Sequence, residues 1–227
     1  MLKGFFLLVF LVSSGFSFNM DGEKEDYIPI SQKKYSEIIN YLETEGKKGS
    51  GESYFYLSQF YLNGSPDKDK DGVSIEKNID IAEDYLIKSS ETYPLGAMTL
   101  GGLYLYNPEF IIKENNIEKS KKYLEIAINN GLLEAHTLLA DIYFNFTGEA
   151  EKAIESLSIA AENNIATAQY ALAVIYNKGL KSETINIEKN DLISSRYLTD
   201  ACENPKKTQK IIDLCFNNQL VIKEKIK

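Results

Sequence analysis

A short acidic loop is the part of this sequence with the clearest potential for chemistry. Asp67, Asp69 and Asp71 alternate with lysines and are followed by Gly72. Carboxylates at positions 1, 3 and 5 with glycine at position 6 are typical of the start of an EF-hand calcium loop, because they can converge on one hard cation. Position 12, where a bidentate glutamate belongs, is Asn78. An ordinary solvated loop is the alternative, and calcium is the one cofactor that the sequence suggests.

The only two cysteines, Cys202 and Cys215, lie close to the C-terminus. In an exported chain they could form a disulfide that links the last repeat to a closing helix. Two separately buried thiols are the alternative, because a simple antiparallel helix pair would place these two positions several turns apart.

Residues suited to catalysis are few. His136 is the only histidine, and it stands at the start of an expected helix, where an exposed polar residue is ordinary. Ser31 and Ser74 each precede a lysine by three residues, the spacing of the Ser-x-x-Lys motif in penicillin-recognising enzymes. The companion motifs Lys-Thr-Gly and Ser-Asp-Asn are absent from the sequence. We therefore expect a protein that is not an enzyme.

The elements that must position these residues are predicted by a repeated pattern of small residues, leucine and tyrosine. In each copy a small residue is followed four positions later by Leu, a second small residue stands directly after that Leu, and Tyr stands four positions after the same Leu. Because these positions share one helical stripe, each copy predicts the first helix of a helical hairpin. The periods between copies are 43, 39 and 33 residues, and the copies end at Tyr61, Tyr104, Tyr143 and Tyr176.

The second helix of each hairpin has its own pattern, a small residue followed three positions later by Tyr or, once, by Ser156. The first small residues are Ala82, Ser120, Ala153 and Ser194. Four residues earlier stand the expected N-caps, which are Asn78, Asn116, Glu149 and Asn190. The tetrapeptide Ile-Glu-Lys-Asn is identical at 75–78 and 187–190. With a half-repeat helix near 32–45 and a closing helix near 206–223, the patterns predict ten helices and no strands.

These patterns resemble the Sel-one-like (Sel1-like) repeat family, which is related to the tetratricopeptide repeats. Residues 100–104, Leu-Gly-Gly-Leu-Tyr, match the family pattern best, and Lys119-Ser120 and Ala160-Ala161 match parts of its second half. The resemblance covers about residues 32–205, and Ser156 departs from it by replacing a large aromatic residue. It implies an all-α, right-handed α-solenoid of four helix-turn-helix repeats with N- and C-terminal capping helices. It also implies an adaptor or scaffold role. Exported bacterial members of the family often act in the cell envelope or in interactions with a host.

The N-terminus has the layout of a secretory signal peptide. Lys3 precedes the apolar run Phe5–Val12, and small residues follow up to Ser17. The run is shorter than the roughly 20 residues that span a bilayer. We predict a signal peptide at 1–17, a flexible segment at 18–31 and a repeat domain at 32–227, in a periplasmic or secreted protein. A retained N-terminal anchor is the alternative.

The charge balance limits the partners. The formal net charge is −8, which argues against nucleic acid and against anionic lipid, because both require a basic surface. Repeat solenoids bind partners on their concave side, which the first helices line. Two outward positions on each first helix predict a partner-binding groove that includes Phe55, Gln59, Met98, Asp141, Tyr170 and Val174, with Thr137 and Gly102 at equivalent places. Packing between neighbouring repeats is the alternative for the apolar members.

Two binding functions fit these observations. The first is an interaction scaffold in the bacterial envelope whose groove holds a protein partner. The second is a periplasmic immunity protein that neutralises a toxic secreted effector, since an acidic chain suits a basic target. The sequence does not identify the partner in either case.

Overall fold

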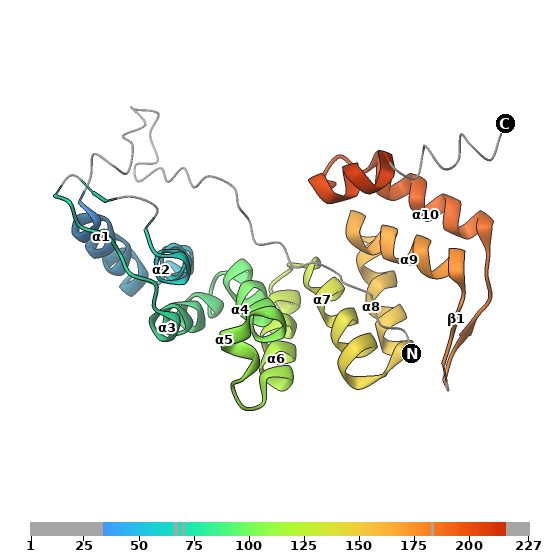
Figure 1. Cartoon of the computed structure of the whole chain (residues 1–227), viewed down its shortest axis with the longest axis horizontal. Coiled ribbons are helices and arrows are strands. Elements are labelled where there is room, and N and C mark those ends of the chain that lie inside the picture. The colour runs from blue at the N-terminus through green and yellow to red at the C-terminus, as the bar shows by residue number, and fades with distance from the viewer. Residues whose placement is uncertain (1–33, 66–67, 70, 183, 217–227) are drawn as a thin grey trace. The chain divides into compact units, whose positions relative to one another are not determined.

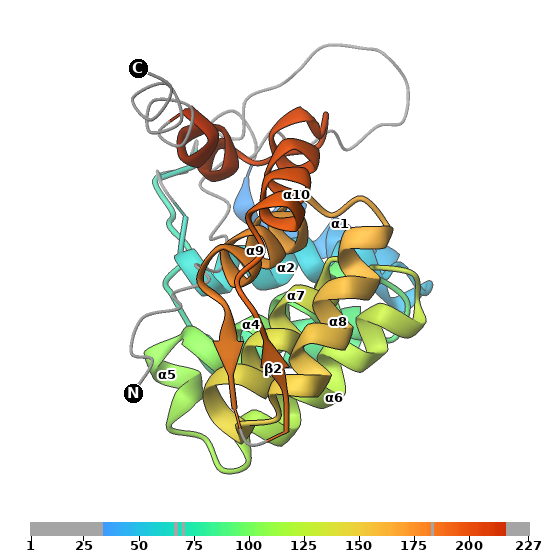
Figure 2. The same ribbon diagram turned by 90° about the vertical axis from the view of Figure 1, so that its right-hand side faces the viewer.

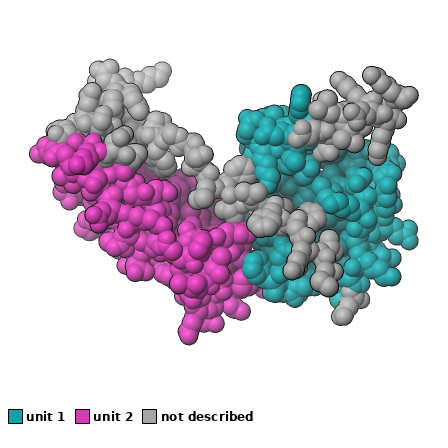
Figure 3. Space-filling view, in the orientation of Figure 1, with its two compact units in different colours: residues 1–7, 131–227 teal, residues 8–130 magenta. Residues whose placement is uncertain are grey.

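Helices account for nearly all of the regular structure in the part of the chain that the computed structural model describes, which is residues 34–65, 68–69, 71–182 and 184–216 (Figure 1). These residues form two compact units, which Figure 3 colours separately. The N-terminal unit ends at residue 130, and the C-terminal unit begins at residue 131. The predicted signal peptide at 1–17 and the flexible segment at 18–31 lie outside the described residues.

The N-terminal unit contains a half-repeat helix and two helical hairpins. Helix α1 is the half-repeat, α2 and α3 form the first hairpin, and α4 and α6 form the second, with the short α5 between them. Their bounds are α1 Tyr35–Lys47, α2 Gly51–Asn63, α3 Ile79–Ser90, α4 Pro94–Tyr106, α5 Pro108–Ile111 and α6 Asn116–Asn129.

The C-terminal unit contains the third and fourth hairpins. Helices α7 and α8 form the third, and α9 and α10 form the fourth. The bounds are α7 Ala135–Ile142, α8 Ala150–Glu162, α9 Ala166–Lys178 and α10 Asp191–Glu203, with a π-helix, Tyr143–Thr147, directly after α7. A further helical segment covers residues 209–216 and corresponds to the start of the predicted closing helix. The four predicted hairpins are therefore confirmed, and the fold class is the all-α class of helical-repeat solenoids.

The prediction of no strands was wrong. Between α9 and α10 the chain forms a β-arm, in which β1 (Leu180–Lys181) pairs antiparallel with β2 (Asn186–Ile187). Figure 2 shows the two strands side by side beyond the ends of these helices. The arm begins at Gly179, whose φ of 74° is accessible to glycine at little cost. A Cβ there would stand 3.0 Å from the Ile187 carbonyl oxygen, so glycine also permits the close return of the chain.

The tyrosines that revealed the repeats pack in pairs inside the hairpins. In three hairpins the first-helix Tyr stacks on the second-helix Tyr, with ring centroids 5.8 to 6.1 Å apart. In the third hairpin Ser156 supplies no ring, and the Lys152 amine lies 5.7 Å from the Tyr143 ring centroid instead. The departure of Ser156 from the repeat pattern thus changes the packing of one hairpin. The stacked pairs are Tyr61–Tyr85, Tyr104–Tyr123 and Tyr176–Tyr197.

The small residues let the paired helices approach closely, as predicted. The Ser120 hydroxyl donates a hydrogen bond of 2.7 Å to the Gly101 carbonyl oxygen, and Ser194 makes the same bond to Ala173. A Cβ on Gly101 would lie 2.8 Å from Cγ of Leu124. These contacts join backbone to side chain across the hairpin, so a larger residue would force the helices apart.

The predicted N-caps are confirmed at two hairpins and misplaced at a third. The side chains of Asn78 and Asn190 each accept the backbone N–H three residues later at 3.0 Å. The prediction for Asn116 was wrong, because Asn115 occupies the cap position with a φ of 54°. Asn116 instead donates its side-chain amide to the Tyr104 carbonyl oxygen. Glu149 stands at the fourth cap position without a side-chain cap.

Within the described residues, no helix combines the length and apolar character needed to cross a membrane.

Candidate functional site

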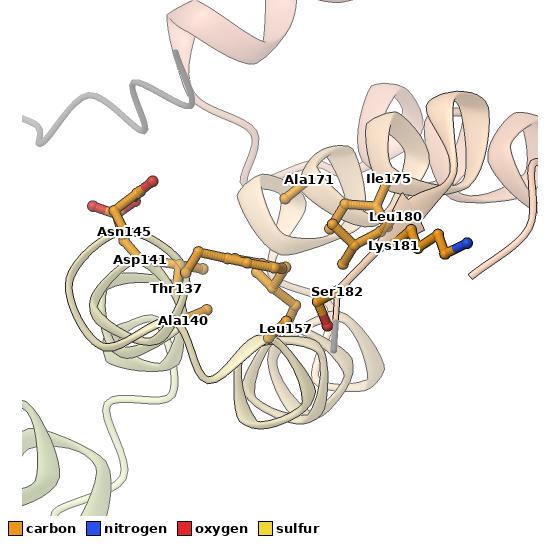
Figure 4. Close-up of a pocket in the computed structure, with 13 residues that line it drawn as sticks. Thr137, Ala140, Asp141, Asn145, Leu157, Ala171, Ile175, Leu180, Lys181 and Ser182 are labelled. Atoms are coloured by element: carbon orange, nitrogen blue, oxygen red, sulfur yellow. The ribbon is translucent and has the colours of Figure 1, made fainter. Parts of the chain in front are cut away.

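A cavity of about 200 Å³ lies inside the C-terminal unit (Figure 4). Its walls come from α7, the π-helix, α8, α9 and β1, so both hairpins of the unit contribute. The apolar part is formed by Leu157 of α8, Ile175 of α9 and Leu180 of β1. Ala140 and Ala171 face the same space, and their short side chains leave it unfilled.

One end of the cavity is acidic and polar. Asp141 lines it with only 6% of its surface exposed, and Asn145 donates its side-chain amide to Oδ1 of Asp141. These two residues stand on α7 and on the π-helix that follows it, and π-helical turns often occur at functional sites. Figure 4 shows their polar ends together, away from Leu157 and Leu180. The amine of Lys181 points outward on the opposite side.

The β-arm forms the outer wall of the cavity. Leu180 faces Ile187 across the strand pair, and the Ser182 hydroxyl accepts the backbone N–H groups of Thr184 and Ile185. Leu180, Lys181 and Ser182 all line the cavity. This wall of the cavity is therefore held in place by hydrogen bonds within the β-arm itself.

Two of the predicted groove residues in the C-terminal unit have clear surroundings. Asp141 lines the cavity, as just described. Tyr170 packs against the cluster of Ala201, Ile211 and Cys215 beneath the closing helix. Val174, also on α9, is half-buried. The structure thus brings one of these three residues to the candidate site.

Of the predicted groove residues in the N-terminal unit, Phe55 lies in a packing cluster. Phe55 packs against the cluster around Leu100 and lies 5.4 Å from the Tyr93 ring, centroid to centroid. Gln59 donates its amide to Ser58 Oγ at 3.3 Å, and Met98 is half-buried. Phe55 and Tyr170 therefore fit the alternative that these positions pack between repeats. The partner-binding role of the six predicted groove residues stays a prediction.

The acidic loop has two described carboxylates, and both bind the protein itself. Asp69 is 7% exposed and accepts the backbone N–H groups of Tyr35, Asp71 and Val73, each at 2.9 Å. The donors at Tyr35 and Val73 lower the pKa of the Asp69 carboxyl. Asp71 forms an ion pair of 2.9 Å with Lys34. The loop is thereby tied to the start of α1.

Calcium binding at this loop stays a prediction. Asp67, the first of its predicted ligands, lies outside the described residues. Over the positions that the structure describes, no three His, Cys, Asp or Glu side chains gather in a way that could hold a metal ion.

A disulfide joins Cys202 and Cys215, whose Cα atoms lie 5.7 Å apart. It links the last turn of α10 to the helical segment 209–216. The turn between them is short and is held by Asn204, whose side chain accepts the Lys206 N–H and donates to the Asn164 carbonyl oxygen. Because this turn is short, the two helices lie close enough at Cys202 and Cys215 for the disulfide to form.

Of the residues considered for catalysis, His136 belongs to the C-terminal unit and Ser74 to the N-terminal unit. His136 is half-buried rather than exposed, and burial lowers the pKa of its imidazole. Ser74 is exposed, and the Lys77 amine binds Glu109 at 2.5 Å. Ser31 lies outside the described residues.

Solved structures identify the fold. A Sel1 repeat protein from Oxalobacter formigenes superposes with a TM-score of 0.60 at 19% identity, over 76% of this chain and 64% of that one. A protective antigen of uropathogenic Escherichia coli with an SLR fold gives a TM-score of 0.59 at 21% identity, over 76% of this chain and 35% of the other. The chain has the Sel1-repeat fold. It spans less than two thirds of the length of either protein.

The Sel1-repeat fold is supported by structure rather than by sequence matching. No protein-family model and no curated protein sequence matches the chain. An immunity protein, Pa5087 from Pseudomonas aeruginosa, superposes with a TM-score of 0.47 at 20% identity, over 78% of this chain and 61% of that one.

Sequence reasoning missed the apolar cavity residues, Leu157, Ile175 and Leu180. Leu157 and Ile175 stand in helices of the repeat core and Leu180 in the loop that follows Gly179, so none of them is marked individually by the repeat pattern. A signal was present in the duplicated tetrapeptide, because it shows that the loops at 64–78 and 179–190 are equivalent. Comparing the two loops would have drawn attention to Leu180, which replaces Ser65.

Proposed function

We propose that this chain is a non-enzymatic binding protein of the bacterial envelope that holds a protein partner through the cavity of its C-terminal unit. The observation that supports this most directly is an apolar cavity with one acidic end inside a Sel1-repeat fold. Its volume of about 200 Å³ is below the range of ~300–1,000 Å³ common for small-molecule sites. A single side chain of a protein partner suits that volume better than a cofactor does.

Location outside the cytoplasm is part of the proposal. The predicted signal peptide at 1–17 supports it. The disulfide between Cys202 and Cys215 supports it independently, because such bonds persist mainly in oxidising compartments such as the periplasm.

An immunity role is the second candidate, and the net charge of −8 favours it. An acidic protein attracts a basic target over long range and speeds their association. In this version the target would be a toxic enzyme, and the chain would block it by binding.

The test is a partner capture that uses a cavity-filled control. Residues 18–227 with a tag would be expressed in a bacterial periplasm as wild type and as Ala171→Leu, which places a larger side chain in the cavity. We expect a protein that binds the wild type and that, when purified, binds Ala171→Leu at least about tenfold more weakly. Circular dichroism and melting curves must show that Ala171→Leu keeps its fold.

The identity of the captured protein separates the two candidates. A basic toxic enzyme whose activity falls on binding supports the immunity role, and an envelope component supports the scaffold role. A partner that binds Ala171→Leu as tightly as wild type would refute binding through the cavity. Repeating the capture with EDTA tests the calcium prediction, since loss of a partner with EDTA would support a metal at the acidic loop.

A further inference from the structure

We infer that the cavity of the C-terminal unit accepts one aromatic side chain of the partner, a phenylalanine or tyrosine ring, in preference to an aliphatic one, with Phe144 as its aromatic neighbour. The inference rests on the proposed function and specifies the chemistry of the partner at that site. Its support comes from an equivalent pair of helices in the N-terminal unit and from the lining and volume of the cavity.

Two helices that form the cavity have close counterparts in the N-terminal unit. Helices α8 and α9 have the same lengths as α1 and α2, and a connection of the same length joins each pair. A shift of 115 positions, the difference between Ala150 and Tyr35, aligns the first pair with the second. The same shift places Gly64 on Gly179. Both glycines have a positive φ, and a Cβ on either would stand 3.0 Å from the carbonyl oxygen of the isoleucine in the shared tetrapeptide.

Aromatic rings fill the equivalent place in the N-terminal unit. Tyr35 of α1 is 2% exposed, and its ring packs edge to face on the ring of Phe60 of α2, with the centroids 6.0 Å apart. Tyr56, one turn earlier on α2, packs against the same core cluster. Two helices in this arrangement therefore hold aromatic side chains between them.

The C-terminal unit has a smaller side chain at each of the three corresponding positions, and all three line the cavity. A larger side chain is gained at one wall position, where Leu180 stands in place of Ser65. Because protein interiors are normally filled, a cavity at the place of two lost tyrosine rings is suited to a ring from outside. The replacements are Ala150 for Tyr35, Ala171 for Tyr56 and Ile175 for Phe60.

The lining of the cavity offers an aromatic contact and an opening. Phe144 of the π-helix is one of the lining residues, and two aromatic rings attract each other beyond what burial of their area alone gives. Asn145, Gly148 and Lys181 line the same cavity and are exposed, so the cavity reaches the surface. A partner's ring can therefore enter and meet Phe144.

The volume of the cavity fits one ring. A cavity of about 150 Å³ lined by leucine, isoleucine and phenylalanine is large enough to bind benzene in another protein. The cavity of this chain measures about 200 Å³. One phenyl or phenol ring therefore has sufficient room.

The experiment compares three capped amino acids, acetyl-phenylalanine-amide, acetyl-cyclohexylalanine-amide and acetyl-leucine-amide. Each is titrated into the full mature chain, and the methyl signals of Leu157, Ile175 and Leu180 are followed by NMR. Cyclohexylalanine has an apolar six-membered ring without aromatic character, so its comparison with phenylalanine isolates the aromatic contact. We expect the phenylalanine amide to bind about three- to tenfold more tightly than either of the others.

Two variants place a tyrosine ring at neighbouring positions of α8. Ala150→Tyr copies Tyr35 of the N-terminal unit, and it should abolish binding of all three amides while the melting temperature is retained. Glu151→Tyr puts the same ring on the next, exposed position and should bind the amides as the wild type does. In Phe144→Leu the leucine amide should still bind and the preference for phenylalanine should be lost, which tests the ring contact even if Ala150→Tyr fails to fold.

The outcomes separate this inference from the proposed function. Binding of the cyclohexylalanine or leucine amide as tight as that of the phenylalanine amide would overturn the aromatic inference and leave the cavity as an apolar anchor for the partner. A preference that survives Phe144→Leu, or unchanged binding to a folded Ala150→Tyr, would overturn it as well. Absence of methyl shifts with all three amides would overturn the inference together with binding through the cavity.

Discussion

At the scale of single residues, Asp69 shows how one carboxylate organises a long loop. Its two oxygens accept three backbone N–H groups, and one of these, from Tyr35, belongs to the first turn of α1. Unpaired N–H groups at a helix start are costly when buried, and Asp69 satisfies one of them from 34 residues away. A single side chain therefore ties the loop of the first hairpin to the half-repeat.

Asp69→Asn should destabilise the protein in a pH-dependent way. The pKa of the Asp69 carboxyl lies below its ordinary value of 3.8 in the folded chain, because backbone N–H groups favour the charged form. Its contribution is therefore fully present above about pH 4 and is lost as the pH falls through the lowered folded value. Urea unfolding should show wild type more stable than Asp69→Asn near pH 7, with the gap narrowing below pH 4. The exposed Asp84→Asn serves as control, and a gap that stays constant with pH would contradict the prediction.

At the scale of elements, the hairpin is the stable unit of this fold, and small residues decide its geometry. In the second hairpin Gly101 of α4 faces Ser120 and Leu124 of α6. The stacked Tyr104–Tyr123 pair joins the same two helices, with centroids 6.1 Å apart. Close backbone approach and aromatic stacking thus act together, which explains why both recur in the sequence at fixed spacing.

Gly101→Ala should destabilise the chain by about 1–3 kcal/mol, because its methyl group would meet Leu124 Cγ at 2.8 Å. Leu124→Ala should also destabilise it, by about 2–5 kcal/mol, through a cavity. The double variant should lose less than the sum, since removing Leu124 makes room for the new methyl group. Chemical denaturation of the four proteins measures this coupling. If the losses of the two single variants simply add in the double variant, the backbone moves to accept the new methyl group, and its contact with Leu124 is not what destabilises Gly101→Ala.

At the scale of the whole chain, the described residues form two compact units, and the disulfide lies in the C-terminal one. The Sel1-repeat fold gives each repeat contacts mainly with its neighbours, so a local change should have local effects. The disulfide lies entirely in the C-terminal unit, where it joins α10 to the segment 209–216. The cavity lies in the same unit. Changes at the disulfide therefore bear on the unit that holds the candidate site.

Removing the disulfide by Cys202→Ser and Cys215→Ser should speed hydrogen exchange in α10 and residues 209–216. A loop of this size contributes about 3 kcal/mol when closed by a disulfide. Exchange in α1, α2 and α3 should stay unchanged. Hydrogen exchange followed by mass spectrometry measures both regions in one experiment, and a reducing agent should have no further effect on the variant. Faster exchange throughout the chain would show that the two units unfold together.

The helices were predictable because their signals are local. The spacing of small residues, leucine and tyrosine specified four hairpins, and Asn78 and Asn190 specified two helix starts. The prediction missed by one residue at Asn116, because Asn115 can adopt the left-handed backbone that frees Asn116 to bind the Tyr104 carbonyl. The two-residue strands of the β-arm gave no alternating pattern long enough to detect.

The sequence by itself therefore determined the all-α repeat fold, since periodicity, caps and small residues act over a few positions each. Only the tertiary structure revealed the cavity through which we propose that a partner binds. A cavity depends on the volumes of side chains from α7, α8, α9 and β1 that meet in space, and Leu157 and Leu180 read as ordinary core residues until their neighbours are placed. For the same reason Phe55 and Tyr170, predicted to face a groove, lie in packing clusters, while Asp141 lines the cavity.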